Sequence, residues 1–344
     1  MTAKIGGAIG KALRFQAISD ERGTKAPDSV GRSGAIGRSA AVDFTGDSGW
    51  ASCDRHGHGR ARPWPQPDYL RPVGPRERGG VSVIAVFYLT FFLLVFALAI
   101  PFLVIGAVTG IQLSPGLPLA ALMAVCPATA ALILAHRDDG AAGAKALLRR
   151  AFDYRRIRKK IWYAPILLLM PGVMVVSFGL MRWSGTPVPA PQIAVVPALI
   201  LCVAFFMSAS AEELGWSGYV IDPMQNRCGA LLASILVGLV WAVFHYVALL
   251  QAHRSLVWIG WWSLWTVALR VIIVWLYNNT GKSVFAAALF HTTINVSWQL
   301  FPIQGSFFDP RITCAITALV AAAVVIVWGP RTLARRAVTV QSEG

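Results

Sequence analysis

Residues 193–217 read IAVVPALILCVAFFMSASAEELGWS. The apolar run within this stretch ends at two adjacent glutamates, Glu212 and Glu213. A helix needs about 20 such residues to cross a bilayer, so the run predicts a membrane-spanning helix over residues 193–213. A charged side chain at membrane depth costs about 2.5–3.5 kcal/mol on insertion scales, and such residues usually serve a function. The two carboxylates are therefore the first candidates for a functional site.

Similar apolar runs recur along the chain from residue 81 onward. Of the 344 residues, 56% are hydrophobic and 14% are charged, whereas about a quarter of the residues of a soluble domain are charged. The sequence therefore predicts an all-α fold, a polytopic transmembrane helical bundle. We expect about eight spans, at residues 81–109, 117–135, 161–181, 193–213, 229–250, 255–277, 283–300 and 312–330.

The two ends of the chain differ from this apolar part. Residues 1–80 are rich in Gly, Arg, Ser and Pro and lack apolar periodicity, which predicts a disordered basic N-terminal tail. Residues 81–330 form the expected transmembrane domain, and residues 331–344 form a short cytoplasmic tail. We therefore expect one membrane domain flanked by two polar ends.

The net charge of +15 gathers beside the apolar runs rather than within them. The connecting loop 136–160 is strongly basic, and the positive-inside rule places such a loop on the cytoplasmic side. Eight spans then put both termini in the cytoplasm, in an integral protein of the bacterial cytoplasmic membrane. Topology control and contact with anionic lipid headgroups account for the charge. The lipid bilayer is therefore an expected partner, and nucleic acid is not.

Few ionisable side chains lie well inside the expected spans, and those few gather in the fourth to seventh spans. Besides the two glutamates they are His245, Arg270 and His291. A shared interior cavity explains this clustering, because a polar side chain is costly against lipid. The alternatives are that the glutamates lie in water at a helix end, and that each histidine only makes a hydrogen bond between helices.

The polar residues of the fifth and seventh spans are spaced by one helical turn. Trp241 precedes His245 by four residues, and Asn295 follows His291 by four, so each pair lies on one helix face. An amide that faces a cavity can donate to a developing negative charge. The adjacent glutamates, by contrast, point about 100° apart on a helix. We expect one of them to take a proton from water and the other to hold the structure.

Three segments together resemble the CPBP intramembrane protease family, which includes type II CAAX prenyl endopeptidases and bacterial Abi-type proteins of bacteriocin immunity. The segments read AEELGWSGY, WAVFH and WLYNNTGKSVFAAALFHTTINVSW. The family pattern is E-E-x-x-x-R, then an aromatic residue-x-x-x-His, then His-x-x-x-Asn/Asp, on separate membrane helices. The residues that match it are Glu212, Glu213, Trp241, His245, His291 and Asn295. The resemblance covers roughly residues 160–330 and implies a protease-like core there.

One position departs from the family pattern. The arginine expected four residues after the second glutamate is Ser217, and a serine cannot neutralise the carboxylate of Glu213. Arg270 is the other cation inside an expected span, so we predict that it pairs with Glu213 instead. The alternative is that Arg270 extends to the membrane interface, where its charge lies in water.

The resemblance implies an enzyme that hydrolyses a membrane-anchored or lipidated peptide within the membrane. Glu212 and His245 would activate a water, His291 and Asn295 would polarise the scissile carbonyl, and Glu213 would support the site. Glu212, His245 and His291 also match the three-ligand pattern of a catalytic Zn²⁺ ion. A metal-free, glutamate-activated site is equally compatible with these residues.

Other functions are also compatible with the sequence. A non-catalytic protein of the same fold would confer immunity to a bacteriocin or toxin, or act as a scaffold, and Ser217 favours this alternative. A transporter is weaker, because the sequence has no recognisable inverted repeat. Hydrolysis also requires Glu212 and His245 to meet, although the expected boundaries place them near opposite ends of neighbouring spans. They meet only if the fourth span continues past Gly218 and the fifth span begins later than expected or is tilted.

Overall fold

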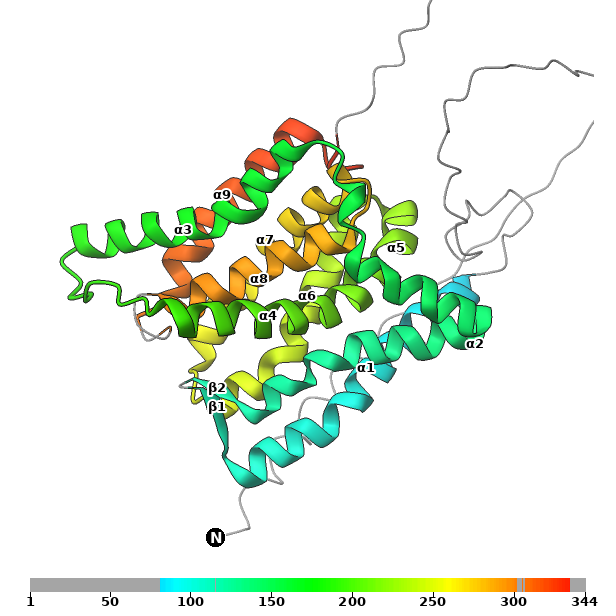
Figure 1. Cartoon of the computed structure of the whole chain (residues 1–344), viewed down its shortest axis with the longest axis horizontal. Helices are drawn as coiled ribbons and strands as arrows, with labels where there is room; N and C mark the ends of the chain where they lie inside the picture. The colour runs from blue at the N-terminus through cyan, green and yellow to red at the C-terminus, as the bar shows by residue number, and fades with distance from the viewer. Residues whose placement is uncertain (1–80, 115, 302–304, 306, 335–344) are drawn as a thin grey trace, which may run out of the picture. The chain divides into compact units, whose positions relative to one another are not determined.

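The computed structural model describes residues 81–114, 116–301, 305 and 307–334, and this part of the chain is almost entirely helical (Figure 1). The long helices are α1 (Val81–Thr109), α2 (Cys126–Arg149), α3 (Tyr163–Trp183), α4 (Val195–Gly215), α6 (Ala230–Gln251), α7 (Leu256–Asn279), α8 (Val284–Leu300) and α9 (Pro310–Trp328). The all-α prediction is thereby confirmed. The predicted tail at residues 1–80 lies outside the described residues, as do residues 335–344 of the C-terminal tail, so the predicted domain boundaries remain predictions.

Shorter elements connect the long helices. They are β1 (Gln112–Ser114), β2 (Leu117–Pro118), the 3₁₀ turns η2 (Leu119–Val125), η3 (Arg150–Phe152), η4 (Tyr154–Arg156) and η5 (Lys160–Trp162), the π-helical turn η6 (Trp216–Val220), and α5 (Ile221–Cys228). β1 and β2 pair as a small antiparallel hairpin between α1 and η2. η6 joins α4 to α5 without a break, so these three elements form one continuous helical stretch.

Local sequence explains where several helices begin. The hydroxyls of Ser255 and Ser283 accept hydrogen bonds from backbone N–H groups in the first turns of α7 and α8, and the Asp309 carboxylate does the same for α9. These side chains satisfy donors that lack an intrahelical partner. Gly229, with φ 81°, separates α5 from α6, a left-handed conformation that glycine adopts readily.

Seven helical stretches among the described residues are long and apolar enough to cross a membrane, which identifies an integral membrane protein. They are Val86–Thr109, Leu119–Phe152, Lys160–Trp183, Val195–Cys228, Ala230–Gln251, Leu256–Asn279 and Pro310–Trp328. The span predicted at 283–300 is helix α8, but with 17 residues it is not one of the seven. It packs against α3, α4 and α7, so neighbouring helices cover much of its surface. The orientation in the membrane remains a prediction.

Two predicted helical segments were too short. The fourth span, predicted at 193–213, continues through η6 and α5 to Cys228, a stretch of 34 residues. Residues 136–149 of the predicted loop 136–160 are also helical, as the end of α2, with a non-helical conformation at Gly140. The segment after that glycine is rich in alanine and leucine, which are strong helix formers, and this explains the longer helix.

The candidate residues lie on α4, α6, α7 and α8, which pack against one another as α4 on α8, α6 on α7 and α7 on α8 (Figure 1). Two glycines permit close approaches. A Cβ added to Gly238 of α6 would lie 3.0 Å from Cα of Val267 on α7, and one added to Gly215 of α4 would lie 2.6 Å from atoms of Pro127 on α2. Small residues at these crossings set the separation between α6 and α7 and between α4 and α2.

Candidate active site

Glu213 lies at the centre of a buried charge cluster. Its side chain has no exposed surface, and its Oε2 lies 2.8 Å from Nη1 of Arg270. The same Nη1 donates to Oε1 at 3.1 Å, and Nδ1 of His291 lies 3.0 Å from Oε1. The hydroxyl of Ser217 donates to Oε2. Both oxygens of Glu213 are therefore occupied, as a buried carboxylate requires.

The pairing of Arg270 with Glu213 confirms the prediction, and the alternative in which Arg270 extends to the membrane interface is wrong. The Arg270 side chain is 1% exposed. Its guanidinium carbon lies 4.2 Å from the centroid of the Trp241 ring, within the range of a cation–π interaction. In this chain α7 provides the cation that the family pattern places at position 217, and Ser217 contacts the same carboxylate through its hydroxyl.

Glu212 has different surroundings, although it is the next residue along the helix. Its Oε2 accepts hydrogen bonds from the indole Nε1 of Trp241 at 2.7 Å and of Trp216 at 3.3 Å. These donors are neutral, whereas those of Glu213 include a guanidinium. Adjacent helical positions point about 100° apart, which explains how the two carboxylates reach separate environments.

His245 and His291 each use Nδ1 for a contact with the protein. Nδ1 of His245 lies 2.9 Å from the carbonyl oxygen of Trp241, and Nδ1 of His291 lies 3.0 Å from Oε1 of Glu213. A carbonyl and a carboxylate oxygen can only accept, so in each contact Nδ1 carries the proton. Nε2 of each ring therefore remains for a water or a substrate.

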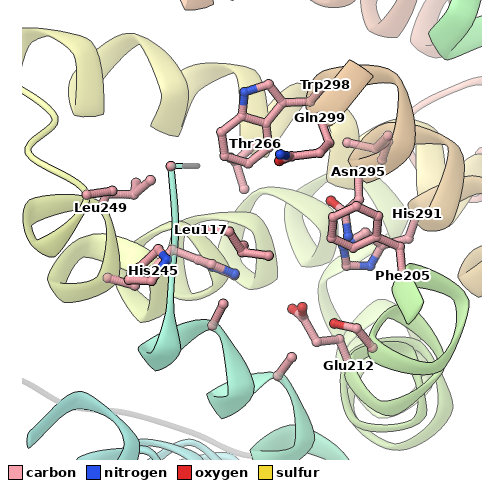
Figure 2. Close-up of a pocket in the computed structure, with 18 of the residues that line it drawn as sticks. Leu117, Phe205, Glu212, His245, Leu249, Thr266, His291, Asn295, Trp298 and Gln299 are labelled. Atoms are coloured by element: carbon pink, nitrogen blue, oxygen red, sulfur yellow. The ribbon is translucent and has the colours of Figure 1, made fainter. Parts of the chain in front are cut away.

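A cavity of about 230 Å³ lies among these helices. Glu212 of α4, His245 of α6, and His291 and Asn295 of α8 line it, and Figure 2 shows these four side chains around one space. Most other lining residues are apolar, including those from the β1–β2 hairpin and η2. A concave, largely apolar site with a few convergent polar groups is the usual form of a binding or active site.

Glu212 and His245 lie at a similar depth because of the long fourth helical stretch. Glu212 lies 16 residues before its end at Cys228, and His245 lies 15 residues after the start of α6 at Ala230. At 1.5 Å per residue, these intervals are about 24 Å and 22 Å. The first condition stated from the sequence, that the fourth span continues past Gly218, is therefore met, whereas α6 begins at Ala230, only one residue later than the expected start of the fifth span.

The structure thus brings four of the five predicted catalytic residues to one cavity, together with Trp241. Glu213 does not line the cavity; it is buried with Arg270 and Ser217 in the adjoining cluster. The alternative in which the two glutamates lie in water at a helix end is wrong, because Glu212 is only 3% exposed.

Sequence reasoning missed several residues around the cavity. Thr266 of α7 and Gln299 of α8 also line it, and Trp216 donates to Glu212. Helical spacing could have indicated all three, because each follows or precedes a predicted residue by four positions: Thr266 precedes Arg270, Gln299 follows Asn295, and Trp216 follows Glu212.

The predicted zinc ligand set does not fit the observed geometry. The part of the chain that the structure describes holds no group of three or more His, Cys, Asp or Glu side chains that could bind a metal ion. Oε2 of Glu212 is turned toward two indole N–H groups, and Nδ1 of His291 faces Glu213. Glu212, His245 and His291 share the cavity wall without converging on one point, so the metalloprotease interpretation is not supported.

Comparisons with known proteins match the region of the chain that holds these residues. Residues 194–297 match the family described as type II CAAX prenyl endopeptidase Rce1-like. The chain is 29% identical over 198 residues to CAAX prenyl protease 2 of Methanococcus maripaludis, covering 53% of this chain and 71% of that protein. It is 24% identical over 199 residues to lysostaphin resistance protein A of Staphylococcus epidermidis, covering 57% of this chain and 50% of that protein.

A further relative is lysostaphin resistance protein A of Staphylococcus haemolyticus, which is 25% identical over 167 residues, with 47% of this chain and 44% of that protein covered. The chain thus spans about half the length of the two staphylococcal relatives. The matched region, 194–297, begins just before α4 and includes every candidate residue of the cavity and of the Glu213 cluster. Through this region the chain resembles the Rce1-like type II CAAX prenyl endopeptidase family.

Proposed function

We propose that this protein is an intramembrane endopeptidase that hydrolyses membrane-anchored peptides with a water activated by Glu212. The observation that carries the proposal is the setting of Glu212, a carboxylate held by two indole N–H groups beside a cavity that His245, His291 and Asn295 also line. A general base must lie within hydrogen-bond reach of the water that it deprotonates, and donors must face the developing oxyanion. These side chains are suited to both tasks.

The reaction requires one proton to move twice. Glu212 takes a proton from the water while the water oxygen bonds to the scissile carbonyl carbon. The carbonyl oxygen then carries negative charge, toward which the Asn295 amide donates a hydrogen bond. Collapse of this intermediate breaks the C–N bond, and Glu212 returns the proton to the leaving amine. Nε2 of His245 accepts a hydrogen bond from the attacking water and orients it.

Glu213 and His291 have a different division of work in this proposal. Glu213 is occupied by Arg270, Ser217 and His291, so it acts as a positioning residue. Its contact with Nδ1 fixes the ring of His291 and directs Nε2 toward the substrate. A carboxylate behind a histidine serves this orienting purpose in many active sites.

The substrate class follows from the family and from the position of the cavity. The match to this family supports a peptide substrate. Three of the helices that line the cavity, α4, α6 and α7, are apolar enough to cross a membrane. A peptide that carries a membrane anchor or a lipid group would be held beside it, so we propose membrane-anchored or lipidated peptides as the substrates.

A second candidate function is immunity to a toxin, or a scaffold role without catalysis. Two of the relatives are named lysostaphin resistance protein A, and position 217 lacks the arginine of the family pattern. The second argument is weakened by the Arg270 ion pair, which provides a cation for Glu213 from another helix.

The purified protein in lipid vesicles tests the proposal against this alternative. Wild type and Glu212→Gln are incubated with a set of membrane-anchored peptides, and the products are identified by mass spectrometry. Glutamine keeps the shape of the side chain and removes its basic oxygen, so we expect cleavage by wild type only. Absence of cleavage by wild type across the set, in a protein with native thermal stability, would favour the immunity or scaffold function.

A further inference from the structure

Arg150 contacts three segments of the chain, and each of them is linked to one member of the buried cluster around Glu213. This side chain lies at the junction of α2 and η3. It donates Nη1 to the carbonyl oxygen of Gly218 at 2.5 Å, and it donates Nη2 to the hydroxyl of Tyr277 at 2.6 Å and to the carbonyl oxygen of Lys282 at 3.2 Å. None of these residues lines the cavity, so Arg150 and its partners take no direct part in the proposed reaction.

Each partner of Arg150 is linked along the chain to one member of the Glu213 cluster. Gly218 belongs to η6 and follows Glu213 by five residues. Tyr277 lies on α7 seven residues after Arg270, which is close to two full helical turns and places both on one face. Lys282 directly precedes Ser283, the residue that caps the helix carrying His291. The Arg150 guanidinium therefore connects the elements that carry Glu213, Arg270 and His291.

The carbonyl of Gly218 lies where the helical hydrogen bonding changes its spacing. In η6 the N–H of Ile221 donates to the carbonyl of Trp216, five residues earlier, which is the π-helical spacing. The π-helical turn ends at Val220, and the α-helix α5 begins at Ile221. Inside this turn the Arg150 guanidinium gives the Gly218 carbonyl a charged donor from another segment of the chain.

Further contacts with Asp222 hold the acceptors of Arg150 in place. The hydroxyl of Tyr277 donates to Oδ2 of Asp222 at 2.9 Å, and Nζ of Lys282 lies 2.8 Å from Oδ1 of the same carboxylate. Lys282 has φ 60°, a left-handed conformation that is uncommon for residues other than glycine. The cluster thus maintains a strained turn so that the Lys282 carbonyl faces Arg150.

We propose that Arg150 is a positioning residue for the active site, which acts by holding the π-helical turn η6. Through Gly218 it sets the rotation of the helical stretch that presents Glu212 to the cavity and Glu213 to Arg270. The inference rests on the proposed peptidase function for its kinetic consequence. The contact between Arg150 and η6 is a property of the fold, and its effect on η6 can be measured without any substrate.

Arg156 provides a matched control on the same segment. It donates Nη1 to the carbonyl of Gly281 at 3.2 Å and pairs with Asp153, so it contacts the same turn as Arg150. In the structure it has no contact with η6 or with Tyr277 among the hydrogen bonds and ion pairs of the described residues. A general loss of a basic side chain in this segment is therefore separable from loss of the contact to Gly218.

The experiment compares Arg150→Met, Arg150→Lys and Arg156→Met in lipid vesicles. Displacement of catalytic groups by about 1 Å can reduce turnover by about 100-fold, so we expect kcat of Arg150→Met to decrease by about 10- to 100-fold with KM little changed. Arg150→Lys, which keeps one donor, should lie in between. Arg156→Met changes a partly exposed side chain and should retain activity within about twofold. Equal losses in Arg150→Met and Arg156→Met would overturn the proposal.

Hydrogen exchange tests the contact with η6 directly. Exchange of residues 216–221, measured without substrate, should increase in Arg150→Met and stay unchanged in Arg156→Met. Unchanged exchange in Arg150→Met would overturn the inference whether or not the wild type cleaves peptides. A wild type without peptidase activity but with the expected exchange pattern would refute only the proposed function.

Discussion

Nη1 of Arg270 on α7 lies 2.8 Å from Oε2 of Glu213 at the end of α4, and the exposed fractions of the two side chains are 1% and 0%. The family pattern would place this cation on the same helix as the carboxylate, at position 217. Here the cation comes from a different helix, and the hydroxyl of Ser217 contacts the same carboxylate from position 217. The charge of Glu213 is therefore balanced by a cation from α7 and not by one from its own helix.

This ion pair predicts a large loss of stability in Arg270→Gln. Removal of one partner of a buried pair leaves an uncompensated charge and destabilises a protein by about 3–5 kcal/mol. Thermal unfolding in detergent or lipid should show a clear decrease in the midpoint relative to wild type. Lys159→Gln, a change at an exposed basic residue of the same protein, should leave the midpoint almost unchanged.

The relocation of the cation predicts a coupling between positions 217 and 270. An arginine at 217 lies four residues after Glu213 and can pair with it on one helix face. Ser217→Arg should therefore destabilise the wild type, where two cations would compete, and should stabilise Arg270→Gln. A double-mutant cycle on the unfolding midpoint measures this coupling. Additive effects of the two changes would contradict the account of Arg270 as the replacement cation.

The indole of Trp241 predicts a loss of turnover in Trp241→Phe. Phenylalanine keeps the aromatic face over Arg270 and removes the N–H that donates to Glu212 at 2.7 Å. A hydrogen bond to a charged group contributes about 1.5–3 kcal/mol, so kcat should decrease by about 10- to 100-fold. Trp265 is the matched control, because it lines the same cavity but its indole donates to Thr317. A comparable loss of kcat in Trp265→Phe would mean that cavity shape, not the hydrogen bond, is responsible.

The proposed oxyanion donor predicts the behaviour of Asn295→Ala. Loss of one such donor typically reduces kcat by about 10²- to 10³-fold, and KM should change little because the contact forms mainly in the transition state. Gln299→Ala alters another amide that lines the cavity one turn further along α8 and should have a smaller effect on kcat. An increase in KM without a change in kcat for Asn295→Ala would assign this residue to substrate binding instead.

Close packing of α4 against α2 predicts that Gly215→Ala is destabilising. The added Cβ would lie 2.6 Å from atoms of Pro127, including its backbone oxygen, and such overpacking typically costs about 1–3 kcal/mol. Gly172 of α3 has no heavy atom within 4 Å of an added Cβ, so Gly172→Ala should leave stability unchanged or raise it slightly. Equal unfolding midpoints for the two variants would contradict the observed α2–α4 contact.

Much of this architecture is predictable from the sequence because its signals are local. Each expected span is an apolar run, and each run corresponds to a helix. The boundaries near the site were less predictable. The polar stretch after Glu213 contains Ser217, Asp222 and Gln225, which would be costly against lipid. In the fold these residues bond to Glu213, Tyr277 and Asn278, so the helix continues through them.

The site residues were predictable where a motif or a helical spacing marks them, as for His291 and Asn295. The partner of Glu213 was found by elimination, since Arg270 is the other cation inside a span. Arg150 could not be found in this way. It lies in a basic segment where topology explains every arginine equally well, and only the fold shows that this one reaches Gly218 and Tyr277.

The most direct test of the central claim is the incorporation of ¹⁸O from labelled water into the product of a membrane-anchored peptide. Wild type in lipid vesicles should release a fragment whose new carboxylate carries one ¹⁸O atom, and Glu212→Gln of equal thermal stability should release almost none. Cleavage at the wild-type rate by Glu212→Gln would contradict the role of this carboxylate as the base. A product without ¹⁸O would contradict hydrolysis by an activated water.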